Sequence, residues 1–379
     1  MTWRTRLSVA EQIERGKAKL KAGKVTVGFD GFVDVLVRPV AKTASVEKDL
    51  KYFQTIEEFG GYLSAHKGIS CSVETEVFVK KFGGNGPHVS NALSCLGADV
   101  DCIGTFGKDK IEPVFSNLPC RLYSFDEPGI STALEFSDGK VMLGERICKK
   151  PDWSRILACT AKAGTSRLLG EPDILALVNW SEISYSYELW QKVLEEYLKK
   201  EGRQKERVVF FDLCDISRKS SEEVLGVLNL IREFSAYRQT ILSMNRKEAT
   251  LVSHIIGTNS CQDVGEKLLR EWEIDQVIVH GCEESILVTR DGTCVHRNNQ
   301  VKNPILLTGA GDTFNGAFCA AMLLGLEDEE RLWFAARFAE DFVRRGKPGT
   351  LEEMEEYALE MQIKPSKVGG QAVLGRQTK

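Results

Sequence analysis

Short runs of apolar and β-branched residues alternate along most of the chain with stretches whose apolar side chains recur at helical spacing. The runs fall at residues 24–30, 99–106, 173–180, 207–213, 239–245 and 276–281. A helix is predicted before the first run, because Ser8 and Glu11 form a capping box and Gly23 supplies a stop after Ala22. Strands that alternate with helices predict an α/β fold with a doubly wound, mostly parallel sheet flanked by helices.

Two segments interrupt this alternation towards the N-terminus. Residues 35–80 are mixed in character, and residues 120–150 contain ISTALEFSDGKVMLGER, which alternates apolar and polar positions around a hairpin turn at Ser137, Asp138 and Gly139. We expect the two segments to pair in space as a small β-rich lid over one edge of the main sheet, although a plain surface excursion stays open for the first.

The α/β core then comprises residues 1–34, 81–119 and 151–379. It contains a second predicted hairpin at residues 285–297, which turns at Asp291 and Gly292 and is expected at the edge of the core sheet.

Composition and charge narrow the class of protein. The chain has 379 residues, of which 42% are hydrophobic, and its net charge of −4 gives it no reason to accumulate on nucleic acid or acidic membranes. No N-terminal signal pattern and no apolar stretch of membrane-spanning length occur, so a cytoplasmic protein is expected. Its eleven cysteines include no C-x-x-C pair, and its five histidines are scattered, so neither a disulfide framework nor a zinc or histidine metal site is predicted.

The candidate chemistry lies in LTGAGDTFNGAF, residues 307–318, where small residues precede a predicted helix. Gly309, Ala310 and Gly311 leave backbone amides bare at the positive end of that helix, which suits a phosphate. Asp312 lies at the same end, where the helix dipole predicts a pKa at or below the usual range for a carboxylate that accepts a proton. Taken alone, the pattern favours an ordinary helix cap, and it is neither a P-loop nor a dinucleotide-binding motif.

Three motifs in one chain carry more weight than any one of them. LLTGAGDTFNGAF, KFGGNGPHVSNALSCLGADVDCIGTFGKD and NRKEA resemble the signatures of the ribokinase-like, or PfkB-type, carbohydrate kinases, and they occur in that family's order between about residues 25 and 345. The resemblance implies a ribokinase-like fold and transfer of the γ-phosphoryl group of ATP to a hydroxyl of a sugar or nucleoside. It also implies Mg²⁺ as cofactor and leaves a monovalent cation open.

The resemblance assigns roles on the phosphate side. Asp312 would be the catalytic base, and Gly309, Ala310 and Gly311 would form the anion hole. The remaining matched residues would bind the nucleotide: Asn245, Glu248, Gly281 and Asn315. Glu248 would also hold the metal, largely through water. Glu284 stands where the family has the second glycine of a nucleotide-side G-x-x-G, which is unfavourable for a polyphosphate unless its side chain points away.

On the sugar side, Asp34 matches the family's first-strand aspartate, with Asp30 as a second candidate. Its glycine motif matches Gly83, Gly84 and Asn85, whose bare backbone permits close approach of a sugar. His88 stands where the family frequently has asparagine, which puts the shape of the sugar pocket in doubt.

Several functions stay open at this level. A non-catalytic sugar or nucleotide sensor with the same fold is the main alternative, and a nicotinamide or flavin oxidoreductase is a third, disfavoured by the missing glycine fingerprint. The acceptor is not identified; a phosphosugar calls for a basic residue in the pocket, and the candidates are Arg38, Lys42 and Arg146. A homodimer paired through the apolar lid sheet is also expected.

Overall fold

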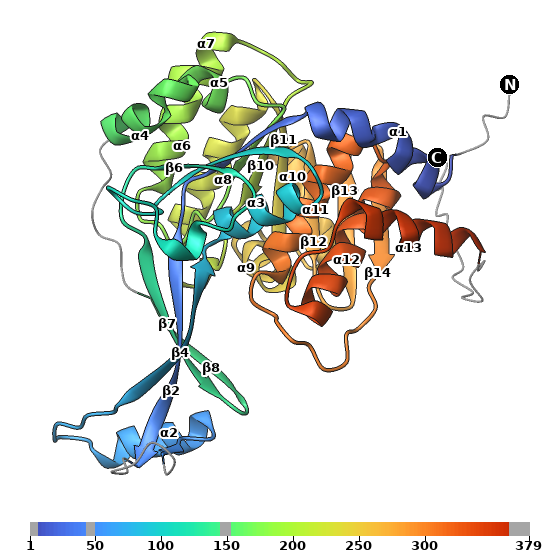
Figure 1. The fold of residues 1–379 in the computed structure, drawn as a ribbon. Coiled ribbons are helices and arrows are strands. Elements are labelled where there is room, and N and C mark those ends of the chain that lie inside the picture. Colours follow the sequence, from blue (N-terminus) through green and yellow to red (C-terminus); the bar gives the residue numbers. More distant parts are fainter. Residues whose placement is uncertain (1–6, 43–49, 145–152, 364–379) are drawn as a thin grey trace, which may run out of the picture.

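The computed structural model describes residues 7–42, 50–144 and 153–363. Within them, the larger sheet has nine strands in the order β14-β13-β12-β11-β10-β9-β1-β5-β6 (Figure 1). The strands are β1 Lys24–Gly28, β5 Asp99–Gly104, β6 Arg121–Ser124, β9 Ile174–Leu177, β10 Val208–Asp212, β11 Gln239–Asn245, β12 Gln276–His280, β13 Glu284–Thr289 and β14 Gly292–Arg297. All neighbours from β12 to β6 are parallel, while β13 and β14 form an antiparallel edge hairpin. The six predicted strands and this hairpin are confirmed.

Helices cover both faces of the larger sheet, because alternate strand residues point to opposite sides and both sides are apolar. One face packs against α1 Val9–Ala22, α3 Asn85–Cys95, α11 Ala310–Leu324, α12 Asp328–Arg345 and α13 Leu351–Ile363. The other face packs against α4 Trp153–Thr160, α5 Thr165–Leu169, α6 Ser186–Val193, α8 Ser221–Ser235, α9 Arg246–Ile256 and α10 Cys261–Glu271. The predicted capping box of the first helix is present, with Ser8 and Glu11 bonded to each other's backbone. A short helix, α7 Lys199–Glu201, follows α6.

The two interrupting segments do pair in space. Among the residues described, they form a second, five-stranded sheet from β2 Phe32–Lys42, β3 Lys51–Tyr52, β4 Thr75–Gly83, β7 Gly129–Phe136 and β8 Gly139–Gly144. The central strand β2 is antiparallel to β4 and parallel to β7, so both segments contribute to one sheet. We call this sheet, together with α2 Ile56–Ala65, the lid; Figure 1 shows it reaching away from the core with α2 at its far end.

The lid differs from the expected segments at its boundaries. In the first segment, strand β2 already begins at Phe32 and strand β4 ends only at Gly83. Asp34 and Gly83 are therefore lid residues rather than core residues. Residues 121–124, predicted as lid, form β6 and pair with β5 in the larger sheet. Residues 145–150 of the second segment lie outside the described residues.

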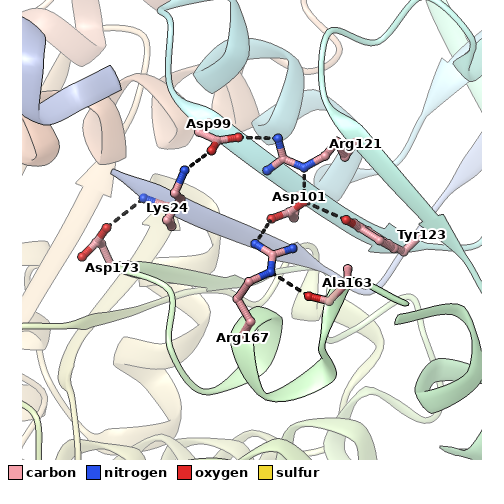
Figure 2. Close-up of polar contacts among 8 residues, drawn as sticks. All are labelled: Lys24, Asp99, Asp101, Arg121, Tyr123, Ala163, Arg167 and Asp173. Carbon is pink, nitrogen blue, oxygen red and sulfur yellow. Dashed lines mark hydrogen bonds and ion pairs between the residues drawn. The ribbon is translucent and has the colours of Figure 1, made fainter. Parts of the chain in front are cut away.

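A charged network ties the amino ends of the core strands together. Asp101, whose side chain is 2% exposed, accepts hydrogen bonds from Arg121 Nε at 2.5 Å, Tyr123 Oη at 3.1 Å and Arg167 at 3.1 Å. Figure 2 shows how Lys24 and Asp99 extend this network along the sheet edge. Because acids and bases alternate in it, the network is internally neutralised. It therefore holds β1, β5, β6 and α5 together at the edge away from the candidate site described next.

Candidate active site

The site lies where parallel strands end. Asp30 follows β1, Asn179 follows β9, Asp212 ends β10 and Asn245 ends β11. Strand β1 has β5 on one side and β9 on the other, so the chain reverses its winding direction here. In open α/β sheets, ligands bind outside the carboxyl ends of the strands at such a point. The helices α3, α9 and α11 also begin near these strand ends, as their contacts with Asp30, Asn245 and Asp212 show.

The glycine-rich turn begins α11 as predicted. Gly309 is its N-cap with φ 86°, a left-handed conformation that favours glycine. A side chain on Gly309 would place its Cβ 2.8 Å from the His88 ring, and one on Gly311 would lie 3.0 Å from the His280 ring. The buried His88 ring and the left-handed φ thus limit position 309 to glycine, while the partly buried His280 ring crowds position 311.

The amides of this turn are not equivalent. The amide of Ala310 donates to Leu307 O at 3.1 Å, and that of Thr313 donates to Gly309 O at 2.9 Å. The amides of Gly311 and Asp312 lie in the first helical turn, where a helix has no acceptor of its own for them. They are therefore the donors best placed for an anion. Of the predicted trio Gly309, Ala310 and Gly311, only Gly311 is one of these two donors.

Asp312 lies in an acidic cluster that the sequence did not reveal. Burial raises the pKa of its carboxyl well above the usual range, and Asp212, Asp30 and Glu248 raise it further, while a hydrogen bond from the Asn85 side chain lowers it. The prediction that the helix dipole would hold this pKa at or below the usual range is therefore wrong for the protein without ligands. A dipole equivalent to about half a charge is outweighed by loss of solvent and three neighbouring acids.

Asp212 is the functional candidate that sequence reasoning missed. It accepts hydrogen bonds from the Cys214 amide at 2.7 Å and from Asn315 Nδ2 at 2.6 Å, and burial raises its pKa to about 6. The only sequence signal for it was a charged residue closing the apolar run of β10, next to the strand that carries Asn245.

Asn315, predicted as a nucleotide-side residue, has both ends of its side-chain amide bonded inside the protein. Its side chain is fully buried, and it accepts a hydrogen bond from Ser243 Oγ at 2.7 Å while donating to Asp212. Because both ends of its amide are engaged inside the protein, Asn315 joins α11 to β10 and β11. It thereby fixes the turn of α11 that carries Asp312.

Asn245 and Glu248 begin α9 as a reciprocal cap. Asn245 Oδ1 accepts from the Glu248 amide at 3.0 Å, and Glu248 Oε2 accepts from the Asn245 amide at 2.9 Å. Burial, followed by the proximity of Asp212, raises the pKa of Glu248 to about 8. Within the described ranges no three acidic, histidine or cysteine side chains are placed to hold a metal directly. Nearby carboxyls with raised pKa values nevertheless suit a divalent cation held through water.

The sugar-side residues meet where the lid joins the core. Asp34 is 6% exposed, and a side chain on Gly83 would overlap its carboxylate. Burial raises the pKa of Asp34, and Lys81 and Lys140 counteract that rise. Asn85 links this side to the phosphate side, because its side chain lowers the pKa of Asp312.

Asp30, the second sugar-side candidate, supports the start of α3. It is fully buried and accepts hydrogen bonds from the amides of Asn85 at 2.8 Å and Gly86 at 2.7 Å, and from Asn179 Nδ2 at 2.7 Å. Its carboxylate therefore holds the start of α3, and Gly84, at φ 94°, lets the chain turn above it.

Comparison with known proteins assigns this sequence to a family. A family model described as prokaryotic ketohexokinase matches residues 2–360. The chain belongs to this prokaryotic ketohexokinase family. It is 25% identical over 355 residues to a ketohexokinase of Haloferax volcanii, covering 90% of this chain and 92% of that protein.

Solved structures show the fold of this ketohexokinase family member. Ribokinase from Thermotoga maritima superposes with a TM-score of 0.61 at 19% identity, covering 89% of this chain and 99% of that one. A putative ribokinase from E. coli, solved with ATP and Mg²⁺, gives a TM-score of 0.61 at 15% identity, with 89% and 99% coverage. The predicted ribokinase-like fold and carbohydrate kinase class are confirmed, and neither a sensor nor an oxidoreductase is supported. No helix in the described part is long and apolar enough to cross a bilayer.

The residues in which this ketohexokinase family member departs from the wider ribokinase pattern have clear positions. Glu284 is paired with Arg246, whose Nη2 lies 2.5 Å from Glu284 Oε1, so its charge is neutralised beside Gly281. His88 is buried between the Phe82 ring and Gly309, and burial followed by Lys81 lowers its pKa to about 4. His88 is thus a neutral ring at physiological pH.

The acidic cluster predicts how stability depends on pH in this ketohexokinase family member. Because the pKa of Asp212 is about 6 in the folded protein, against roughly 4 in an unfolded chain, the folded state holds more protons between these values. The stabilisation is therefore complete below pH ~4 and is lost as the pH rises through about 6. We expect Asp212→Asn to flatten this decline in the free energy of unfolding by roughly 1–3 kcal/mol.

The measurement is denaturant unfolding of the ligand-free protein at a series of pH values. Asp291→Asn, on the exposed β13–β14 turn, is the matched control and should keep the slope of the wild type. An Asp212→Asn protein with the same pH slope as the wild type would show that this carboxyl does not titrate in that window.

Proposed function

We propose that this protein transfers the γ-phosphoryl group of ATP to a primary hydroxyl of a ketohexose, with Asp312 as general base. The observation that carries the proposal is the contact of the Asn85 side chain with the carboxyl of Asp312, whose pKa Asn85 lowers against the effect of burial. It joins the sugar-side glycine motif to the carboxylate that begins α11, beside the amides of Gly311 and Asp312. An acceptor hydroxyl held by Asn85 is thereby adjacent to both the base and the anion-binding turn. The name of the matched family indicates the ketohexose.

On the sugar side, Asp34 accepts hydrogen bonds from adjacent hydroxyls, and Gly83 and Gly84 leave room for the ring. Asp312 takes the proton of the attacking hydroxyl, and the free amides of its helix turn stabilise the charge on the phosphoryl oxygens. Asn85 orients Asp312 in this role.

The nucleotide side fits ATP with Mg²⁺. Glu248 would hold the cation through water, next to Asn245, and Gly281 leaves the end of β12 bare for the polyphosphate. When bound, Mg²⁺ would neutralise phosphate charge that the acidic cluster otherwise repels. Burial and, to a smaller extent, repulsion from neighbouring carboxyls raise the pKa values of Asp212 and Glu248.

The charges near Asp34 favour a neutral acceptor over a phosphosugar. Two acids, Asp34 and Glu135, and two bases, Lys81 and Lys140, lie near this position, so the charges of these four described residues balance. Arg38 lies with its guanidinium 4.8 Å from the Phe78 ring, on the lid. The core side is acidic, which further disfavours a second phosphate.

An acceptor panel in an ADP-release assay tests the proposal. D-fructose and other ketohexoses should be turned over with the highest kcat/KM, ahead of aldohexoses, ribose, a nucleoside, a sugar acid and fructose phosphates. Analysis of the product by NMR identifies the phosphorylated hydroxyl. Preference for a phosphosugar or a nucleoside would refute the ketohexose assignment, and phosphorylation of a secondary hydroxyl would refute the assigned position.

A homodimer through the lid is proposed as well. Most of the exposed large apolar side chains of the described residues lie on the lid, among them Ile130 at 46% and Leu143 at 54%. These two lie on the sheet face opposite Asp34, because Asp34 pairs with Ser131 whereas Leu143 pairs with Thr132. Apolar sheet faces of this kind are covered by a partner in stable proteins.

We expect light scattering to give twice the chain mass for the wild type. Ile130→Glu should shift the mass to that of a monomer, because it buries a charge in the proposed contact. Lys108→Glu, on the core surface, is the control. A monomeric wild type would refute the dimer.

Three further expectations are also proposals. A cytoplasmic location follows from the free thiols and the composition, and lack of affinity for nucleic acid follows from the net charge. A monovalent cation requirement rests on the family resemblance and is tested by comparing turnover in potassium and in tetramethylammonium salts.

A further inference from the structure

A lysine of the lid contacts the loop that leads into the anion-binding turn. Lys140 is the second residue of β8, directly after the hairpin turn of the lid. Its ammonium donates a hydrogen bond to Thr308 Oγ1, and Thr308 immediately precedes Gly309. This hydrogen bond spans 168 positions of the sequence and connects the lid hairpin to the phosphate side of the site.

The same ammonium is within electrostatic reach of the sugar side. Lys140 counteracts the rise in the pKa of Asp34, and it lowers the pKa of Lys81, which pairs with Asp34 across β2 and β4. Lys140 is therefore near both the acceptor-binding carboxylate and the phosphate-binding turn. The γ-phosphoryl group must pass between these two places.

The charge of Lys140 is not consumed by an ion pair. Among the residues that the structure describes, no carboxylate lies within 4.0 Å of its ammonium. Glu135 on β7 is its register partner across the hairpin, through backbone pairing. Thr308 offers a neutral hydroxyl, which satisfies one of the three N–H donors and leaves the positive charge in place. A flexible four-carbon stem lets the ammonium exchange that hydroxyl for a phosphoryl oxygen.

We propose that Lys140 is a catalytic residue delivered by the lid, which leaves Thr308 and binds the oxygens of the migrating phosphoryl group. The inference rests on the proposed kinase function and deepens it. In the reaction, a bond forms between the acceptor oxygen and the γ-phosphorus while the bond from that phosphorus to the bridging oxygen of ADP breaks. The acceptor proton goes to Asp312, and ADP leaves with the electron pair. Lys140 exchanges no proton and stabilises the negative charge on the transferred group.

Three lid variants test this role. Lys140→Met keeps the length of the side chain and removes its charge, and Lys140→Arg keeps the charge. Lys80→Met removes a lysine from the opposite face of the lid sheet, on strand β4, which pairs with β2. We expect Lys140→Met to lower kcat about 10- to 100-fold with little change in the KM for the ketohexose, because the contact exists only as the phosphoryl group moves. Lys140→Arg should recover part of the loss, and Lys80→Met should match the wild type.

Binding of a phosphoryl mimic separates this role from a structural one. Aluminium fluoride with Mg·ADP imitates the transferring group, so Lys140→Met should weaken that complex by a factor similar to the loss in kcat while Mg·ADP alone binds normally. Equal weakening of both complexes, or a kcat within twofold of the wild type, would overturn the proposal. The binding experiment needs no turnover. A wild type inactive on every acceptor would therefore refute the kinase function, while the role of Lys140 would still be tested by the binding of the phosphoryl mimic.

Discussion

Replacing Asp312 by asparagine is expected to lower kcat by roughly 10²–10⁴, the range for the loss of a general base. The amide keeps the shape of the carboxylate and can still accept the hydrogen bond from Asn85, but it cannot take the proton of the acceptor hydroxyl. The KM for the ketohexose should change little, because Asp34 and the glycine motif hold the sugar. Steady-state ADP release, with the affinity for the sugar measured by calorimetry, checks both halves of this expectation.

The matched control is Asp328→Asn, which removes an acidic residue from the first turn of another helix, α12. It should have normal turnover, which separates the chemistry from a general helix-start effect. The variant of Asp312 should also gain stability at neutral pH, because burial and three neighbouring acids oppose its charge. Nearly normal turnover in Asp312→Asn would require a different base.

Replacing Asp34 by alanine is expected to raise the KM for the ketohexose by about 10²–10³, with a smaller effect on kcat. A hydrogen bond to a charged group contributes about 1.5–3 kcal/mol, and the carboxylate can accept from two adjacent hydroxyls. The lid is also affected, because Lys81 on β4 loses its acidic partner Asp34 on the paired strand β2. The affinity for Mg·ATP should stay close to that of the wild type, because the nucleotide residues lie on the core.

Glu76→Ala provides the control for Asp34→Ala. Glu76 is on the same lid sheet and accepts a hydrogen bond from Tyr52 Oη at 2.5 Å, but it lies near the far end of β4 from Gly83. If both variants raised the KM equally, the effect of Asp34→Ala would be a loosening of the lid. If neither did, Asp34 would not bind the sugar.

The sequence allowed the helices and strands near the site to be predicted because their signals are local. The apolar runs became β1, β5, β9, β10, β11 and β12, and the Asn245–Glu248 pair is the cap that its spacing indicates. Gly309 begins α11 where the small residues predicted a helix start. Each of these features depends on residues that are close together in the sequence. Periodicity and capping chemistry were therefore sufficient to predict them.

The relations among carboxylates could not be predicted in the same way. Asp30 and Asp212 are 182 positions apart in the numbering, yet each affects the charge of Asp312 because the order of parallel strands brings their carboxyl ends to one edge. Asn315 matched a nucleotide-side position by motif, and only the packing of α11 on β10 and β11 showed that its amide is engaged internally.

By itself, the sequence determined the α/β class, the existence of a lid and the residues that begin α11, since these depend on local patterning and on motifs. The tertiary structure alone decided that Asp30 supports α3, that Lys140 of the lid reaches Thr308, and that Asp312 has a raised pKa. The physical reason is that burial and charge proximity are set by strand order and sheet pairing, which join residues that are distant along the chain.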